Sequence, residues 1–213
     1  PQVIRKLNGL TSDFYAREAA SFSATRQAPW HGWEKAWELI TAPDAVQDPF
    51  PSHAAVRDSL SSRAARIPND YASNSKDSLA VLDLGCGNLR FERFLAERAN
   101  APLRVTALDN CPDLASPEIG ALSAAFPHSL RSTSAASKTK EEDASGQGAN
   151  PPEKTIVDLR ALDIVESLLD GTFADRLPRN SHDLAVAFGL MHHLPTFALR
   201  ARVLEGILGS LRP

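Results

Sequence analysis

The chain has 213 residues, of which 43% are hydrophobic and 23% charged, enough for one globular domain with a substantial core. It contains no run of about 18 apolar residues, which excludes a membrane-spanning helix, and its net charge of −3 argues against broad electrostatic binding to nucleic acid. Two cysteines, Cys86 and Cys111, are too few for a disulfide framework, and the first residues lack the apolar stretch of a secretory signal. We therefore expect a reduced, cytoplasmic protein.

Residues 1–70 predict a mostly helical segment that precedes the main domain. Aromatic side chains are concentrated there, and all three tryptophans fall within PWHGWEKAW, residues 29–37. Their roughly helical spacing is more typical of a packed core than of a ligand site. A proline-containing connection and a short helix near residues 56–65 follow. We interpret residues 1–70 as a helical cap, or lid, on a core domain of residues 71–213.

From residue 79 the pattern changes to alternating strands and helices. Short hydrophobic runs predict buried strands at LAVLDLG, LRVTALD, TIVDLRALDI and HDLAVAFGLM, and amphipathic helices are predicted at LRFERFLAERA and PTFALRARVLEGILGSL. This alternation predicts an α/β fold with a Rossmann-like, doubly wound, mostly parallel sheet. The apolar side chains expected to face inward from the last helix are Val203, Leu204, Ile207, Leu208 and Leu211.

Two features depart from this alternation. Residues 131–154 are small and polar, so they cannot bury enough apolar surface to offset the entropy of ordering, and we expect a disordered insertion. The chain ends in ILGSLRP, where a turn into a further strand is expected. We therefore expect that C-terminal strands are missing from this chain, or that a partner covers the open edge of the sheet.

A glycine-rich turn follows the first predicted strand in VLDLGCGN. Gly85 and Gly87 would let the main chain approach a ligand closely. A dinucleotide fingerprint requires a third glycine, whereas Asn88, Leu89 and Arg90 follow here. Asp109 ends the next strand about 20 residues later, where a carboxylate suits the two hydroxyls of a ribose. Such a ribose belongs to NAD and to S-adenosylmethionine alike, so Asp109 alone does not decide between them.

Taken together, VLDLGCGN, VTALDN, LRALDI and HDLAVAFGLMHHLP resemble, in order and spacing, the class I S-adenosylmethionine-dependent methyltransferases, and the resemblance spans residues 79–213. It implies that the GCG turn surrounds the methionine end of S-adenosylmethionine and that Asp109 holds the ribose. It also implies that Asp163 lies near the adenine amino group. The cofactor-binding residues implied in this part of the chain are Asp83, Gly85, Cys86, Gly87, Asp109, Asn110, Asp163, Ile164, Phe188, Gly189 and Met191.

The segment FYAREAASFSATRQAPWHGW is similar to the F-S-x-T-R-x-x-P-W opening of a narrower group. These are the methyltransferases that esterify carboxymethyl-uridine at the tRNA wobble position, together with their bacterial relatives. The similarity implies that this segment lies over the cofactor pocket, with Tyr15, Thr25, Arg26 and Trp30 as candidate contacts.

Several of these residues also have a structural interpretation. Asp83 is equally suited to satisfying loop amides at the end of a strand, and Cys86 is more typical of a small buried filler than of a nucleophile. Arg26 suits a surface ion pair as well as a ligand contact.

The pair His192–His193 supplies the candidate catalytic groups. The resemblance places MHHLP at the mouth of the site, where a neutral imidazole could accept a proton from a hydroxyl or a ring nitrogen. Neighbouring residues on a strand end or turn point in different directions, so we expect at most one of them to face the pocket. A histidine that caps the following helix is an equal alternative. No second cluster of metal ligands lies nearby in the sequence, so no metal is predicted.

The prediction is therefore a methyltransferase that uses S-adenosylmethionine and an oxygen or nitrogen acceptor, either a small molecule or the tRNA wobble uridine carboxylate. If the acceptor is an ionised carboxylate, a cation such as Arg26 would position it. The alternatives are an NAD-dependent oxidoreductase and a non-catalytic module that binds S-adenosylmethionine or serves as a scaffold.

Overall fold

The structure is a computed structural model that describes residues 1–41, 78–99, 103–115 and 156–213. The predicted boundary between cap and core, the helix predicted near residues 56–65 and the insertion predicted at 131–154 lie outside these residues. In chain order the elements are α1 (Gln2–Thr25), α2 (His31–Thr41), β1 (Leu79–Leu84), α4 (Arg90–Arg98), β2 (Leu103–Asp109), the short 3₁₀ helix η4 (Pro112–Leu114), β3 (Ile156–Ala161), α6 (Ile164–Asp170), α7 (Phe173–Arg176), β4 (Leu184–Val186), the 3₁₀ helix η5 (Met191–His193) and α8 (Phe197–Ser210).

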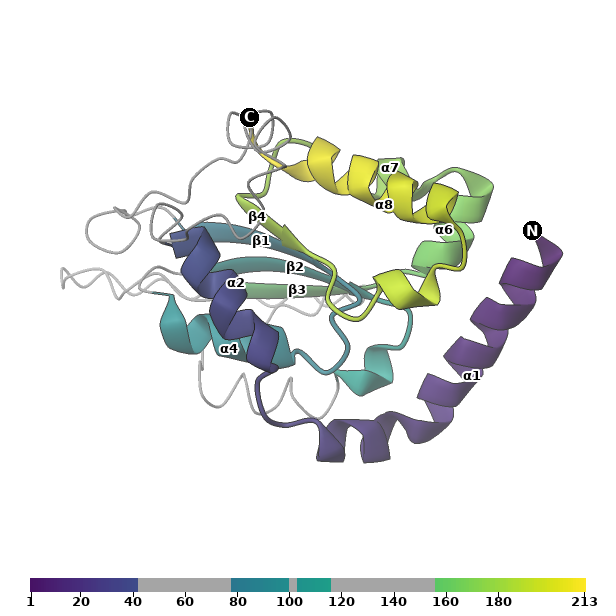
Figure 1. The fold of residues 1–213 in the computed structure, drawn as a ribbon, viewed down its shortest axis with the longest axis horizontal. Coiled ribbons are helices and arrows are strands. Elements are labelled where there is room, and N and C mark those ends of the chain that lie inside the picture. Colours follow the sequence, from purple (N-terminus) through teal and green to yellow (C-terminus); the bar gives the residue numbers. More distant parts are fainter. Residues whose placement is uncertain (42–77, 100–102, 116–155) are drawn as a thin grey trace, which may run out of the picture.

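The described strands form one open, four-stranded sheet in the order β3-β2-β1-β4, with every pair parallel (Figure 1). Val81 of β1 lies opposite Val105 of β2 on one side and opposite Leu184 of β4 on the other. The prediction of an α/β protein with a parallel sheet is confirmed. Along the chain, β2 pairs with β1 and β3 pairs with β2, whereas β4 pairs with the other edge of β1. In open parallel sheets, ligands bind at such a reversal, beyond the carboxyl ends of the strands.

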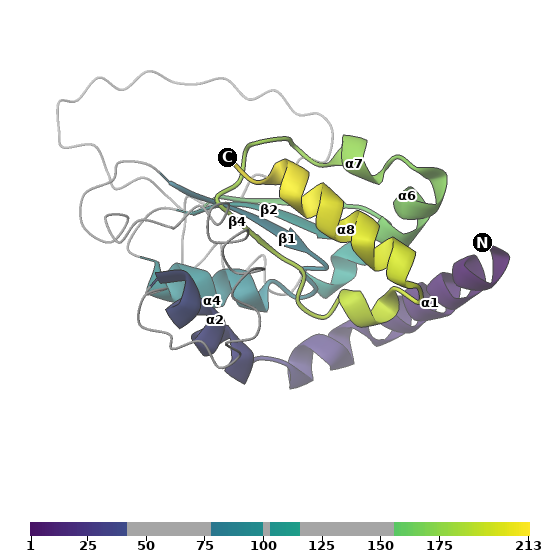
Figure 2. The ribbon, with the colours of Figure 1, turned by 45° about the horizontal axis from the view of Figure 1, so that its top comes forward.

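Helices cover both faces of this sheet, because side chains on a strand alternate between its faces. Leu79 and Val81 point to the same face as α2 and α4, where they share an apolar cluster with Trp33 and Phe94. Leu82 and Leu84 belong to the cluster on the opposite face, with side chains of α6, α7 and α8. Figures 1 and 2 show these two layers of helices on either side of the strands. The helix predicted to be amphipathic at LRFERFLAERA is α4, and its apolar residues Phe91, Phe94 and Leu95 are all buried.

Helix α8 turns a narrower face to the core than its apolar pattern predicts. Leu199 and Val203 are buried and Ile207 is partly buried, at a spacing of four residues that keeps them on one side of the helix. Leu204 and Leu208 are 51% and 57% exposed, so their predicted inward orientation is wrong. The reason is the close approach of α7: a Cβ at Gly206 would lie 2.5 Å from Phe173 Cε1, and this contact sets which face of α8 meets the core.

The N-terminal helix α1 crosses the side of the molecule at which the strands end (Figure 1). Ala19 packs with Cys111 and Leu114 beside η4, and Ser23 Oγ donates a hydrogen bond to the Leu114 carbonyl at 3.1 Å. No helix within the described ranges is both long enough and apolar enough to cross a membrane. The contacts with η4 place α1 next to the loops that follow the strands.

Candidate functional site

A cavity of about 570 Å³ lies beyond the carboxyl ends of the strands, between α1 and the loops that follow β1, β2, β3 and β4. It occupies the reversal of strand order between β1 and β4, where ligand sites are found in sheets of this kind. Every site residue singled out from the sequence lines this cavity except Met191 and Thr25. The structure therefore brings together, around one space, residues that are up to about 180 positions apart in the chain.

The two exceptions have clear physical causes. Met191 begins the 3₁₀ turn η5 and packs with the apolar cluster under α8, whereas its neighbour Leu190 faces the cavity. Thr25 ends α1, and its hydroxyl donates back to the carbonyls of Ser21 and Phe22 at 3.0 and 3.1 Å. Both side chains are therefore used by the fold rather than offered to the cavity.

The main chain of the GCG turn is close to the cavity because glycine can adopt left-handed dihedral angles. Gly85 has φ +78° and Gly87 has φ +56°, and a Cβ at Gly85 would lie 3.4 Å from Leu190 Cβ. The Gly85 amide donates to the Leu108 carbonyl at 2.7 Å, which ties the turn to the end of β2. Leu89 follows with φ 55°, an uncommon value for a non-glycine residue, and lies at the N-cap of α4 with its side chain fully buried. These angles bring the turn over the end of the sheet.

Asp109 joins the loops after β1 and β2. Its Oδ2 accepts from the Gly87 amide at 2.9 Å, and its Oδ1 accepts from the Cys111 amide at 2.8 Å. Burial raises the pKa of this carboxyl, and the hydrogen bonds from backbone amides oppose that rise. Each carboxylate oxygen has a second lone pair for a ligand hydroxyl. Asp109 therefore both holds the glycine turn in place and offers acceptors to the cavity.

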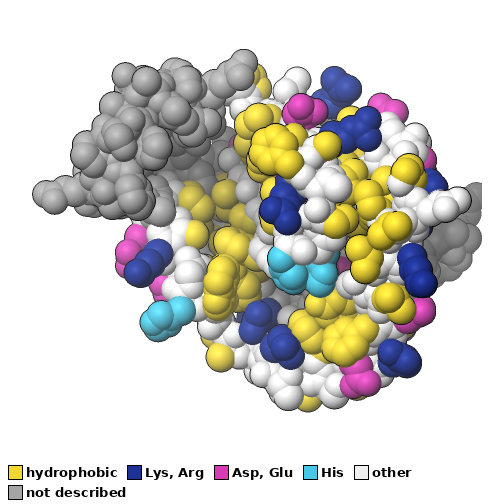
Figure 3. All heavy atoms as spheres, turned by 45° about the vertical axis from the view of Figure 1, so that its right-hand side comes forward, with side chains coloured by type: hydrophobic (Ala, Val, Ile, Leu, Met, Phe, Trp, Pro, Cys, Tyr) yellow, Lys and Arg dark blue, Asp and Glu magenta, His cyan; other side chains and the backbone are white. Residues whose placement is uncertain are grey.

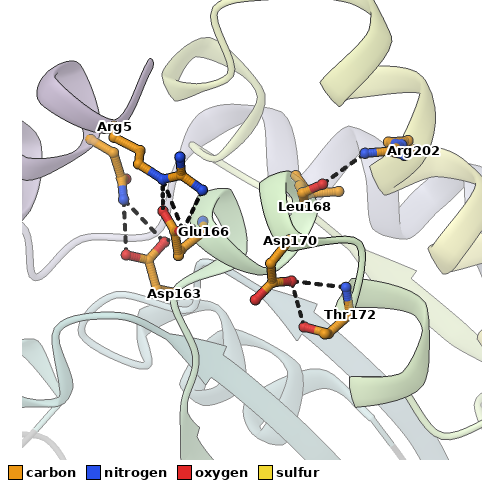
Figure 4. A network of polar contacts seen from close by, with 8 residues as sticks. Arg5, Asp163, Glu166, Leu168, Asp170, Thr172 and Arg202 are labelled. Carbon is orange, nitrogen blue, oxygen red and sulfur yellow. Dashed lines mark hydrogen bonds and ion pairs between the residues drawn. The ribbon is translucent and has the colours of Figure 1, made fainter. Parts of the chain in front are cut away.

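Asp163, in the loop after β3, connects this loop to α1. It caps α6 by accepting from the Glu166 amide at 2.9 Å, and Asn8 Nδ2 donates to its two oxygens at 2.8 and 3.1 Å. One turn away, Arg5 pairs with Glu166 at 2.9 Å (Figure 4). Sequence reasoning missed Asn8. The available signal was its spacing of seven residues from Tyr15, which puts both side chains on one face of α1.

Aromatic rings close the cavity on the side of α2 and the β4 loop. Trp33 is buried among Phe91, Phe94 and Phe188, with ring centroids 5.2 to 5.8 Å apart, so it is chiefly a core residue. Trp30 is 56% exposed, lines the cavity and lies edge-on to Phe188 at 6.0 Å. Of the two, Trp30 has more surface free for a ligand.

Both histidines of MHHLP line the cavity, so the expectation that at most one would face it is wrong. That expectation assumed a strand-like alternation, whereas η5 is a helical turn whose neighbouring side chains diverge less. The rings of His192 and His193 lie 3.9 Å apart, and Tyr15 Oη lies 3.4 Å from His193 Nε2. Histidine side chains gather near the centre of the face in Figure 3, with hydrophobic side chains above and below. Burial, and then the charge of His192, lower the pKa of His193, which favours its neutral, proton-accepting form.

The floor of the cavity is acidic. Asp83 is only 2% exposed, and Cys86 lies in the turn above it. Burial raises the pKa of the Cys86 thiol well above its usual range, and the carboxyl groups of Glu92, Asp83 and Asp109 add to this effect. Cys86 is therefore a thiol at neutral pH, which agrees with its interpretation as a buried filler.

Arg26 lies at the rim, with its guanidinium carbon 3.9 Å from the centroid of the Phe22 ring. Its Nη1 donates to the Thr25 hydroxyl at 3.1 Å. Arg90 also lines the cavity, and it donates to the Ala28 carbonyl in the connection between α1 and α2. The two guanidinium groups give this rim a positive charge that opposes the acidic floor.

No protein-family model matches the chain, and the search of curated proteins finds no match. The geometry of the cavity and the motifs that line it are therefore the basis for assigning a function.

Proposed function

We propose that the chain is a class I, S-adenosylmethionine-dependent methyltransferase with a Rossmann-like, doubly wound core and α1 as part of its cover. One observation carries the proposal: the GCG turn and the Asp109 carboxylate are joined directly, by the 2.9 Å hydrogen bond from the Gly87 amide, beside the strand reversal. A nucleoside bound there would meet main chain on one side and a carboxylate on the other.

The remaining residues around the cavity fit the parts of S-adenosylmethionine. Asp109 offers acceptors for the two ribose hydroxyls, and the left-handed glycines leave room for the methionine end. Asp163 and the backbone of Ile164 lie at the edge of the cavity near Leu162, where a purine amino group would find an acceptor. When bound, S-adenosylmethionine supplies a methyl group that is already activated on a sulfonium sulfur.

The protein's own contribution is alignment, exclusion of water and placement of a proton acceptor. Burial lowers the pKa of His193 and so favours its neutral form, and Tyr15 at 3.4 Å orients its ring, so an imidazole nitrogen can accept a proton from a hydroxyl or amine acceptor. For an ionised carboxylate acceptor no base is needed, and Arg26 at the rim supplies a bidentate cation. Trp30, with more than half of its surface exposed, provides a flat apolar wall for the acceptor.

We propose a small molecule or the tRNA wobble uridine as the acceptor. The exposed Trp30 ring and the arginines at the rim favour an anionic, planar acceptor, which either source provides. The net charge of −3 favours the small molecule. Transfer of labelled methyl groups to a metabolite panel and to tRNA, at two salt concentrations, separates the two sources.

Titration calorimetry with S-adenosylhomocysteine tests the cofactor. We expect binding by the wild-type chain and a loss of about 10- to 100-fold in affinity for Asp109→Asn, because a carboxylate acceptor is removed from the ribose site. Asp113→Asn, an exposed change in η4, is the matched control and should bind like the wild type. Stabilisation by NAD and not by S-adenosylhomocysteine would favour the oxidoreductase. Binding without transfer to any acceptor would favour the non-catalytic module.

A further inference from the structure

Beneath the floor of the cavity, Asp83 at the end of β1 faces Glu92 in the first turn of α4. The two side chains are 2% and 1% exposed. Among the described residues, Asp83 Oδ1 and both Glu92 oxygens are buried without a hydrogen-bond partner, and the two carboxyl groups are close enough to interact with each other. Asp83 lines the cavity and Glu92 does not. The pair is therefore a buried acidic site with one member open to a ligand.

The groups around the pair cannot neutralise its charge. The titratable side chains that face it are the Asp109 carboxyl from β2 and the Cys86 thiol from the turn after β1. Two adjacent buried carboxylates cannot both be ionised at moderate cost, so one holds a proton and donates it to the other. Burial is the main reason that the pKa of Asp83 lies well above its usual range and that the pKa of Glu92 is raised to about 7. At neutral pH the pair in the free protein therefore holds at least one shared proton.

We propose that Asp83 and Glu92 form a proton-exchanging cation subsite, in which a positively charged group of the ligand replaces the shared proton and the proton leaves to solvent. No covalent bond changes: the O–H bond of one carboxyl is broken, and the buffer takes up the proton. The inference rests on the proposed function, because S-adenosylmethionine is the cationic ligand to which it applies. Asp83 lines the cavity and is the residue that contacts the ligand. Glu92 is a positioning residue that acts through Asp83.

Proton release gives the subsite two measurable consequences. Affinity for a cationic ligand rises with pH until the pair is ionised in the free protein, by up to about tenfold per pH unit for each proton released. The subsite also favours a ligand that carries a positive charge over a neutral one of the same shape, because only the charged ligand compensates the ionised pair.

Calorimetry of the full wild-type chain with S-adenosylmethionine, between pH 6 and 8 in buffers of different ionisation enthalpy, counts the protons released. We expect about one proton at neutral pH and the matching rise in affinity with pH. Infrared spectroscopy provides a second readout: the band of a protonated carboxyl, present in the free protein at pH 7, should weaken when the ligand binds.

Glu92→Gln tests the positioning role. A glutamine amide has nearly the same shape and donates to Asp83 without a titrating proton, so proton release and the dependence of affinity on pH should both be smaller than in the wild type. Glu97→Gln, an exposed change on the same helix, is the control and should release protons like the wild type.

The outcomes are distinct. Binding by the wild type without proton release, or unchanged release in Glu92→Gln, overturns the subsite and leaves the methyltransferase proposal standing. No binding of S-adenosylmethionine at all overturns both. If Glu92→Gln does not fold, the wild-type proton count and the infrared band decide the question by themselves.

Discussion

Two glycines of α8 allow a sharp test of how this helix packs. A Cβ at Gly206 would lie 2.5 Å from Phe173 Cε1 and 3.1 Å from Leu177 Cδ1, whereas a Cβ at Gly209 has nothing within 4 Å. Alanine at either position gains up to about 1 kcal/mol from helix propensity. At Gly206 the ring of a buried phenylalanine must also move, and overpacking of this kind costs about 1–3 kcal/mol. We therefore expect Gly206→Ala to be less stable than Gly209→Ala by about 1–3 kcal/mol.

Urea unfolding followed by circular dichroism measures this difference, provided that both variants keep the wild-type dependence on urea. Because the propensity gain is similar at the two sites, the difference isolates the contact between α8 and α7. Equal stabilisation of the two variants would refute the reasoning, since it would mean that α7 does not pack against Gly206. A fall in both stabilities would contradict the helical backbone of α8 at these two positions, because alanine adopts helical angles readily.

Three further predictions concern His182 before β4, helix α1 and the glycine turn. His182 is buried and hydrogen-bonded to Ser210 and Thr106, and burial lowers its pKa, so this residue binds a proton more readily in the unfolded chain and its own contribution to stability should fall between about pH 7 and pH 5. The slope of unfolding free energy against pH should therefore be less positive in His182→Gln than in the wild type. Asn8→Ala removes the contact with Asp163, so α1 should be cleaved faster in limited proteolysis while the unfolding free energy drops by only about 0.5–1.5 kcal/mol; an unchanged cleavage rate would contradict the attachment. Gly87→Ala, at φ +56° with open space around it, should cost about 1–2 kcal/mol from backbone strain alone, and a neutral result in thermal unfolding would count against that turn geometry.

Much of the local structure follows from the sequence pattern. The run LAVLDL predicts a strand buried on both faces, and in the structure β1 is buried along its whole length. Phe91, Phe94 and Leu95 share a helix face at a spacing of three and four residues, which is the face that α4 buries. The glycines of the turn likewise follow from local rules, because the left-handed angles there are accessible to them without strain.

The sequence alone determined where the four strands and the helices α1, α4 and α8 lie, and which motif residues follow the strands, because those properties depend on near neighbours. Only the tertiary structure decided that β4 lies beside β1, that Leu190 rather than Met191 faces the cavity, and that Glu92 is buried beside Asp83. Glu92 lies among other charged residues of α4, and nothing in the neighbouring sequence predicts that its side chain is buried. Contacts between residues that are distant in the chain create the environment of Glu92. The residue pattern within one segment cannot predict the free energy of such contacts.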